Sequence, residues 1–146
     1  MRKIADVMTS DCVTLSPNDN VFEAAVLMRD HDIGFVPVVE GRRLIGVCTD
    51  RDLVIRGYAD KHPGSASITE VMTLDVQTVS PNLSVDEAVT IMKNKQIRRL
   101  PVVENGELQG IVALGDLAVR DIFVSEAGEA LSGISEQEHR ESQAFH

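Results

Sequence analysis

The chain has 146 residues, of which 43% are hydrophobic and only 3% aromatic, with no tryptophan. This length suits one compact domain or two very small subdomains that share a core, and the composition argues against wholesale disorder. Lys and Arg number 14 against 23 Asp and Glu, which gives a net charge of −9. A protein that tracks nucleic-acid phosphates needs a positive face, so we expect no nucleic-acid partner.

The amino-terminal region predicts neither a signal peptide nor a membrane segment. Acidic residues such as Asp6 and Asp11 interrupt any apolar run, and no stretch approaches the roughly 18 apolar residues of a membrane span. The two cysteines, Cys12 and Cys48, are too few and too far apart for a disulfide framework or a metal site. Each aligns with a valine 64 residues later, Val76 or Val112, so both are predicted to be small buried hydrophobes. We expect a cytoplasmic protein without a membrane partner.

The chain contains an internal duplication. Every match lies at an offset of 64 residues, and 22 of the 50 aligned pairs between 4–53 and 68–117 are identical. The clearest matched segments are 4–9 with 68–73, 16–18 with 80–82, 37–40 with 101–104, and 52–53 with 116–117. Such self-similarity at a fixed period indicates two copies of one structural unit.

In chain order, each copy predicts a strand, a helix, two strands and a second helix. The first copy has an extended segment at 13–15, a helix after the N-cap Asn20, strands at 35–40 and 44–48, and a helix near 50–57. The second copy has these elements at 77–79, after the N-cap Ser84, at 100–104, at 108–112 and near 115–124. Glu23 and Glu87 stand three positions after the N-caps, which is the spacing of a capping box.

A unit of about 50 residues with one small sheet cannot bury both faces alone. We therefore predict an α+β (α/β) fold in which the two repeats pack sheet to sheet with pseudo-two-fold symmetry. The predicted organisation is repeat 1 at 1–56, a linker at 57–67, repeat 2 at 68–124, and an acidic tail at 125–146 with a short helix and a loose end.

The repeated motifs resemble the CBS (cystathionine β-synthase) domain, and two in tandem resemble a CBS pair, or Bateman module. The motifs are V-M-T, T-x-S-P-N, I-x-x-x-P-V-V-E and G-h-x-T-x-x-D-L, where h is apolar. The resemblance covers residues 4 to about 122 and suggests a small stand-alone bacterial member. Segments 31–34 and 49–52 are similar to hypoxic-response-type members. Each motif alone is weak, but their order at a fixed offset is specific.

The resemblance implies regulatory binding of adenosine-containing ligands, such as AMP, ADP, ATP, S-adenosylmethionine or dinucleotides, in clefts between the repeats. It also implies a homodimer. The residues themselves point to Thr49 and Asp52, because an N-cap hydroxyl and a helix start can hold a phosphate and a carboxylate can accept from ribose hydroxyls. The alternative is that these two residues only cap the helix; the resemblance favours binding.

The second repeat predicts a different site. It retains Asp116, but Ala113 replaces the Thr or Ser that is usual in the family, and this removes one donor. Arg98 and Arg99 stand just before the shared proline and favour phosphate, since the planar guanidinium matches it. Gly34 and Phe35 occupy these positions in repeat 1, so the two sites are not expected to be equivalent.

The resemblance also maps apolar contacts for adenine. They are Ala5, Ser10 and Ile33 in repeat 1, and Thr69, Leu74 and Ile97 in repeat 2, each set facing the aspartate of the other repeat. The alternative for Ile33 and Ile97 is that they belong to the core.

No Ser/His/Asp, Cys/His or metal-ligand arrangement stands out, so neither catalysis nor a resident cofactor is predicted. The leading hypothesis is a non-enzymatic module whose nucleotide-dependent packing is sensed by an unidentified protein partner. The alternatives are a dimeric interaction scaffold with clefts that bind nothing, and a small enzyme acting on a nucleotide. The enzyme is disfavoured because no general base or nucleophile accompanies the proposed phosphate position.

Overall fold

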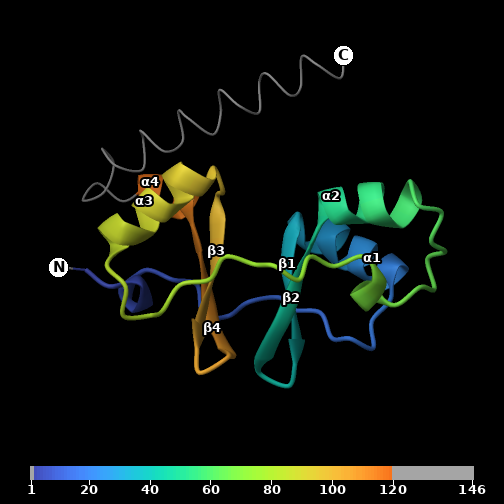
Figure 1. The fold of residues 1–146 in the computed structure, drawn as a ribbon, viewed down its shortest axis with the longest axis horizontal. Helices are drawn as coiled ribbons and strands as arrows, with labels where there is room; N and C mark the ends of the chain where they lie inside the picture. The colour runs from blue at the N-terminus through green and yellow to red at the C-terminus, as the bar shows by residue number, and fades with distance from the viewer. Residues whose placement is uncertain (1, 120–146) are drawn as a thin grey trace, which may run out of the picture. The chain divides into compact units, whose positions relative to one another are not determined.

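The computed structural model describes residues 2–119, so the predicted tail at 125–146 and the end of the last predicted helix lie outside the described residues. The elements confirm a mixed α and β fold (Figure 1). In chain order they are α1 (Val21–His31), β1 (Phe35–Glu40), β2 (Arg43–Thr49), α2 (Asp50–Asp52) with a π-helical continuation (Leu53–Tyr58), α3 (Val85–Lys95), β3 (Arg99–Glu104), β4 (Glu107–Ala113) and α4 (Leu114–Val119). Short 3-10 turns precede the two halves at Ile4–Asp6 and Ile68–Glu70.

The two long helices begin at their predicted N-caps. The Glu23 backbone N–H donates to Asn20 Oδ1 at 2.8 Å, and the Asn20 N–H donates back to Glu23 Oε1 at 3.1 Å, which completes the capping box. At α3, the Glu87 N–H donates to Ser84 Oγ at 3.1 Å. These bonds satisfy N–H groups that the first helical turn leaves without a partner, so local sequence alone sets both starts.

The strands form antiparallel hairpins with two-residue turns. In the first hairpin Phe35 pairs with Thr49 and Glu40 with Arg43, and in the second the turn is Asn105–Gly106, both with positive φ. Arg43 of β2 also pairs with Glu107, the first residue of β4. The extended segments predicted at 13–15 and 77–79 contribute only isolated parallel bridges, Leu15 to Val38 and Val79 to Val102.

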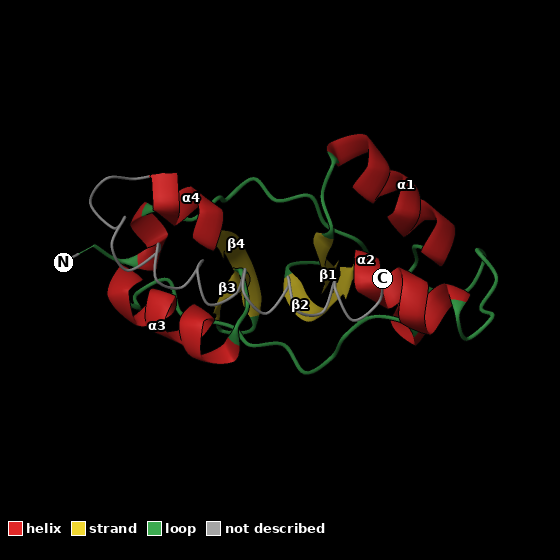
Figure 2. Cartoon of the chain, turned by 90° about the horizontal axis from the view of Figure 1, so that it is seen from above, coloured by secondary structure: helices red, strands yellow, loops and turns green. Residues whose placement is uncertain are grey.

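The described chain divides into two compact units that do not coincide with the sequence repeats. Unit 1 comprises residues 2–11, 78–104 and 109–119, and unit 2 comprises residues 12–77 and 105–108. Each unit therefore contains the body of one repeat and the leading segment of the other. In unit 2, α1 runs beside the α2 helix and its continuation (Figure 2), where Gly57 is buried near Val21.

Apolar burial holds each leading segment in its unit. Ile4 and Val7 lie in the core of unit 1, and Ile68, Val71 and Met72 lie in the core of unit 2. Both isoleucines are fully buried. Each leading segment thus packs against the body of the other repeat, and we call this arrangement the exchange of leading segments. Burial of these apolar side chains away from water is its main driving force, and backbone hydrogen bonds align the segments.

Two matched glycines let the leading segments approach the sheet closely. Thr73 bridges to Val47 in unit 2, and a Cβ on Gly46 would lie 2.8 Å from the Thr73 carbonyl oxygen. In unit 1, Thr9 bridges to Ile111, and a Cβ on Gly110 would lie 2.6 Å from the Thr9 carbonyl oxygen. Only glycine leaves room for this crossing, which brings residue 73 to the start of α2.

Candidate functional site

The start of α2 in unit 2 carries the two polar residues that the sequence singled out. Thr49 is the N-cap, and its Oγ1 accepts from the Asp52 backbone N–H at 3.1 Å. The Thr49 N–H donates in return to Asp52 Oδ2 at 3.0 Å. The structure thus shows the capping role of this pair, and a ligand-binding role would be additional to it.

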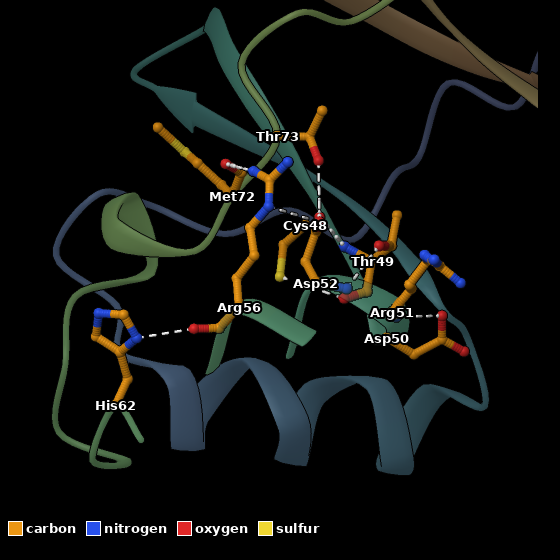
Figure 3. Close-up of polar contacts among 9 residues, drawn as sticks. All are labelled: Cys48, Thr49, Asp50, Arg51, Asp52, Arg56, His62, Met72 and Thr73. Atoms are coloured by element: carbon orange, nitrogen blue, oxygen red, sulfur yellow. Dashed lines mark hydrogen bonds and ion pairs between the residues drawn. The ribbon is translucent and has the colours of Figure 1, made fainter. Parts of the chain in front are cut away.

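The Asp52 carboxylate is the centre of a wider polar network (Figure 3). Thr73 Oγ1 donates to it, 3.0 Å from each carboxylate oxygen, and Arg56 Nε lies 4.0 Å from Oδ1. Arg56 Nη1 also donates to the Met72 carbonyl at 3.1 Å. Asp52 is only 7% exposed, so these bonds and that of the Thr49 N–H compensate for its loss of water. The network ties the first repeat to the leading segment of the second.

The thiol of Cys48 lies beneath this network. Burial, together with the negative charges of Asp52 and Asp50, raises its pKa from 9.0 to about 12. The thiol therefore stays protonated at neutral pH and lacks the thiolate that nucleophilic chemistry requires. Cys48 is fully buried, as predicted, whereas the prediction is wrong for Cys12, which is only partly buried.

Three further predicted residues lie in the same unit. Leu74 is 70% exposed and directly follows Thr73. The Thr69 hydroxyl lies 2.8 Å from Ser67 Oγ at the start of the 3-10 turn, and Ile33 packs against the core of unit 2. Unit 2 therefore contains five of the predicted residues, which come from both repeats: Ile33, Thr49, Asp52, Thr69 and Leu74.

The other six predicted residues belong to unit 1: Ala5, Ser10, Ile97, Arg98, Arg99 and Asp116. The Ala5 N–H donates to the Pro81 carbonyl at 2.9 Å, and the Arg98 carbonyl accepts from the Leu114 N–H at 2.8 Å. Ile97 packs against the core of this unit. Asp116 is exposed, in contrast to its buried counterpart Asp52. The two aspartates of the repeated motif thus stand in different environments.

The grouping of the apolar contacts differs from the prediction at two positions. The sequence groups Ile33 with Ala5 and Ser10, but Ile33 lies in the unit of Asp52. Ile97 likewise lies in the unit of Asp116 and not with Thr69 and Leu74. The reason is that the leading segments lie in the unit of the other repeat, whereas both isoleucines belong to the bodies of their own repeats.

Sequence reasoning missed three residues that shape this site. Thr73 and Arg56 complete the Asp52 network, and Asp50 lies against Gly34, where a Cβ would meet its Oδ2 at 2.7 Å. One signal was available: the threonine of V-M-T recurs at Thr9 and Thr73, and its hydroxyl had no assigned role.

A separate pocket of about 350 Å³ lies along the exposed side of α1 in unit 2. Its lining includes apolar Phe22 and Leu27 and acidic Asp19 and Asp30, with His31 at one end. None of the predicted ligand residues lines it. It is therefore distinct from the Asp52 network.

Within residues 2–119, no three His, Cys, Asp or Glu side chains lie together in a way that could hold a metal ion. Over the same part of the chain, no helix has the length and apolar character needed to cross a membrane.

Comparison with known proteins gives a consistent picture. The family model of the CBS domain matches twice, at residues 4–57 and 68–121. Protein YlbB of Bacillus subtilis is 48% identical, with the whole of both chains covered. The crystal structure of Hypoxic Response Protein I with two coordinated zinc ions has 34% identity and a TM-score of 0.74, covering 82% of this chain and 98% of that one; the protein of that name is from Mycobacterium tuberculosis.

A third similar structure contains ligands. The CBS domain pair of protein MJ0100, in complex with 5′-methylthioadenosine and S-adenosyl-L-methionine, has 26% identity and a TM-score of 0.70. It covers 82% of this chain and 94% of that one. The duplication, the matching order of elements in its two copies and the two family matches together show that the chain belongs to the CBS domain family and carries two CBS domains in tandem.

Proposed function

We propose that this CBS pair is a non-enzymatic regulatory module that binds an adenosine-containing ligand, such as AMP, ADP or ATP. The observation that carries the proposal is the make-up of unit 2. There Asp52 of the first repeat, which forms a capping box with Thr49, accepts a hydrogen bond from the hydroxyl of Thr73 in the second repeat. A ligand at this point would contact both repeats. Its binding would therefore alter how one repeat holds the other.

The proposed roles follow the chemistry of each side chain. Asp52 and Asp116 accept from ribose hydroxyls, Thr49 donates to a phosphate or hydroxyl, and Arg98 with Arg99 holds a phosphate. The remaining residues line the adenine: Ala5, Ser10 and Ile97 in unit 1, and Ile33, Thr69 and Leu74 in unit 2. With few aromatic residues in the chain, the base would lie mainly against aliphatic groups.

The Asp52 network offers a route from binding to signal. A ribose hydroxyl that bonds Asp52 would take the place of the Thr73 hydroxyl and free the segment that follows Met72. A ligand can shift such an equilibrium only by its differential affinity for the two states. We expect a homodimer in the cytoplasm, with an unidentified protein partner that responds to the shifted state.

The ligands of the MJ0100 pair support the choice of an adenosyl compound. The direct test is calorimetric titration of nucleotide-stripped protein with AMP, ADP, ATP, S-adenosylmethionine, NAD and cyclic dinucleotides. Asp116→Asn is the informative variant, because Asp116 is exposed and its loss should leave folding intact. We expect it to weaken one site at least about tenfold, while Asp30→Asn on α1 changes nothing. If none of these ligands binds in the titration, the proposal is wrong.

A second candidate is a dimeric scaffold whose sites bind no nucleotide. One observation favours it: the Asp52 carboxylate already has the Thr49 N–H, the Thr73 hydroxyl and the nearby Arg56 as partners. Ala113 also removes a hydroxyl from the other unit. On this alternative, Asp52→Asn lowers stability and no adenosyl ligand protects the wild-type protein against thermal unfolding.

A further inference from the structure

The two units hold one pair of positions in the same backbone geometry. In unit 2 the Asp50 N–H donates to the Gly34 carbonyl at 3.0 Å. In unit 1 the matched Leu114 N–H donates to the Arg98 carbonyl at 2.8 Å. Residues 34 and 50, and the matched residues 98 and 114, are therefore backbone neighbours within their units. Each pair directly adjoins proposed ligand residues in the chain.

The side chains at these matched positions differ in kind. A Cβ on Gly34 would lie 2.7 Å from Asp50 Oδ2 and 3.0 Å from its Cγ, so the carboxylate stands where a larger residue at 34 would begin. The Arg51 N–H donates to Asp50 Oδ1 at 2.8 Å and fixes it there. In unit 1 the first position carries the Arg98 guanidinium, and Leu114 is fully buried and uncharged.

The residue differences at these matched positions give the two units different local charges. The neighbours Phe35 and Arg51 of the first pair become Arg99 and Gly115 in the second. The four residues Gly34, Phe35, Asp50 and Arg51 carry no net charge, whereas Arg98, Arg99, Leu114 and Gly115 carry +2. A phosphate would gain attraction in unit 1 and would meet the Asp50 carboxylate in unit 2.

We propose that the two sites take different classes of adenosyl ligand. The unit 1 site takes a phosphate-bearing nucleotide that Arg98 holds. The unit 2 site rejects the phosphate through Asp50 and takes an adenosyl compound whose 5′ substituent is neutral or cationic, such as a thioether or a sulfonium. This inference rests on the proposed function, since it assigns ligand classes to the same two sites.

The test measures stoichiometry and competition by calorimetry on stripped, full-length protein. We expect wild type to bind one AMP and, without competition, one 5′-methylthioadenosine or S-adenosylmethionine per chain. Arg98→Ala should abolish the AMP event and leave the second event unchanged. Asp50→Asn keeps the acceptor for the Arg51 N–H but removes the charge, and it should strengthen AMP binding at the unit 2 site roughly fivefold.

The double variant Gly34→Arg/Asp50→Leu copies the unit 1 pair into unit 2. We expect it to bind two AMP per chain, with thermal unfolding measured in parallel to establish that it folds. Asp30→Asn is the matched control, because it removes an exposed carboxylate of α1 in the same unit. If the double variant does not fold, the AMP titrations of Asp50→Asn and Arg98→Ala test the assignment of ligand classes without it.

The outcomes separate this inference from the proposed function. The assignment of ligand classes would be wrong if wild type bound two AMP with equal affinity. It would also be wrong if AMP bound in unit 1 and no adenosyl ligand bound in unit 2. Neither result would contradict the proposed regulatory module. No binding of any adenosyl ligand would overturn both. An AMP event that survives Arg98→Ala would also overturn the assignment.

Discussion

The hydroxyl of Thr73 donates to the carboxylate of Asp52, 3.0 Å from each oxygen, across 21 positions of sequence and from one repeat to the other. Asp52 also closes the capping box of α2 with Thr49. One buried carboxylate therefore fixes both a helix start and the path of the exchanged segment. This double role makes the residue a point of coupling between the repeats.

Thr73→Val tests the strength of this coupling. Valine keeps the shape of threonine but removes the donor, so the buried carboxylate loses one partner. We expect the free energy of unfolding to fall by about 1–3 kcal/mol, measured by urea denaturation. Thr90→Val is the matched control, since the exposed Thr90 hydroxyl donates only to a carbonyl of its own helix, and we expect a change within about 0.5 kcal/mol. Equal effects would contradict the role of the bond.

Gly46→Ala tests the close crossing that brings Thr73 to Asp52. The added Cβ would lie 2.8 Å from the Thr73 carbonyl oxygen and 3.0 Å from Met72 Sδ, so the backbone of the exchanged segment must move. We expect a loss of about 1–3 kcal/mol in unfolding free energy. Gly115→Ala meets no atom within 4 Å in α4 and should be neutral or stabilise by up to about 1 kcal/mol. A neutral Gly46→Ala would disprove the crossing.

Cys48 predicts a dependence of stability on alkaline pH. Its pKa is about 12 in the folded protein against 9.0 as the ordinary value, so the folded state retains a proton that the unfolded state releases. The thiol therefore contributes stability that is fully present below pH 9 and is lost as pH rises from about 9 towards 12. Cys48→Val places at this position the valine that is buried at the matched position 112. In urea denaturation at a series of pH values, this variant should lack the part of the fall in unfolding free energy that the thiol causes.

Thiol labelling provides a second measurement on the same residue. We expect Cys12, which is partly buried, to react with a disulfide reagent in the native protein, and Cys48 to react only after unfolding in urea. Fast labelling of both thiols in the native state would contradict the raised pKa.

The exchange of leading segments predicts which fragment folds. Residues 12–77 contain Ile68 and Met72 together with the body of the first repeat, whereas residues 1–66 lack both core side chains. We expect fragment 12–77 to show a cooperative thermal transition and fragment 1–66 to show none. Ile68→Ala in fragment 12–77 should cost about 2–5 kcal/mol, because it leaves a cavity in the core. Folding of fragment 1–66 alone would refute the exchange.

The duplication, the helix starts and the hairpin turns of this protein follow from the sequence read locally. The fixed offset of 64 identifies the duplication, Asn20 and Ser84 set the helix starts, and the turn at Asn105–Gly106 sets a hairpin, because capping and turn conformations depend on a few adjacent residues. The same local reasoning finds Thr49 as the N-cap of α2. The family resemblance extends this to the tandem CBS pair.

The tertiary structure alone decided which residues meet. The bond between Thr73 and Asp52 depends on the route of the chain between the repeats, and propensities within a window of a few residues do not encode that route. The separation of Ile33 from Ala5 and Ser10 has the same origin, since burial of Ile4 and Ile68 places each leading segment in the unit of the other repeat, whereas Ile33 stays with the body of its own repeat. Sequence determined the elements and their copies, and long-range burial determined how those copies are combined.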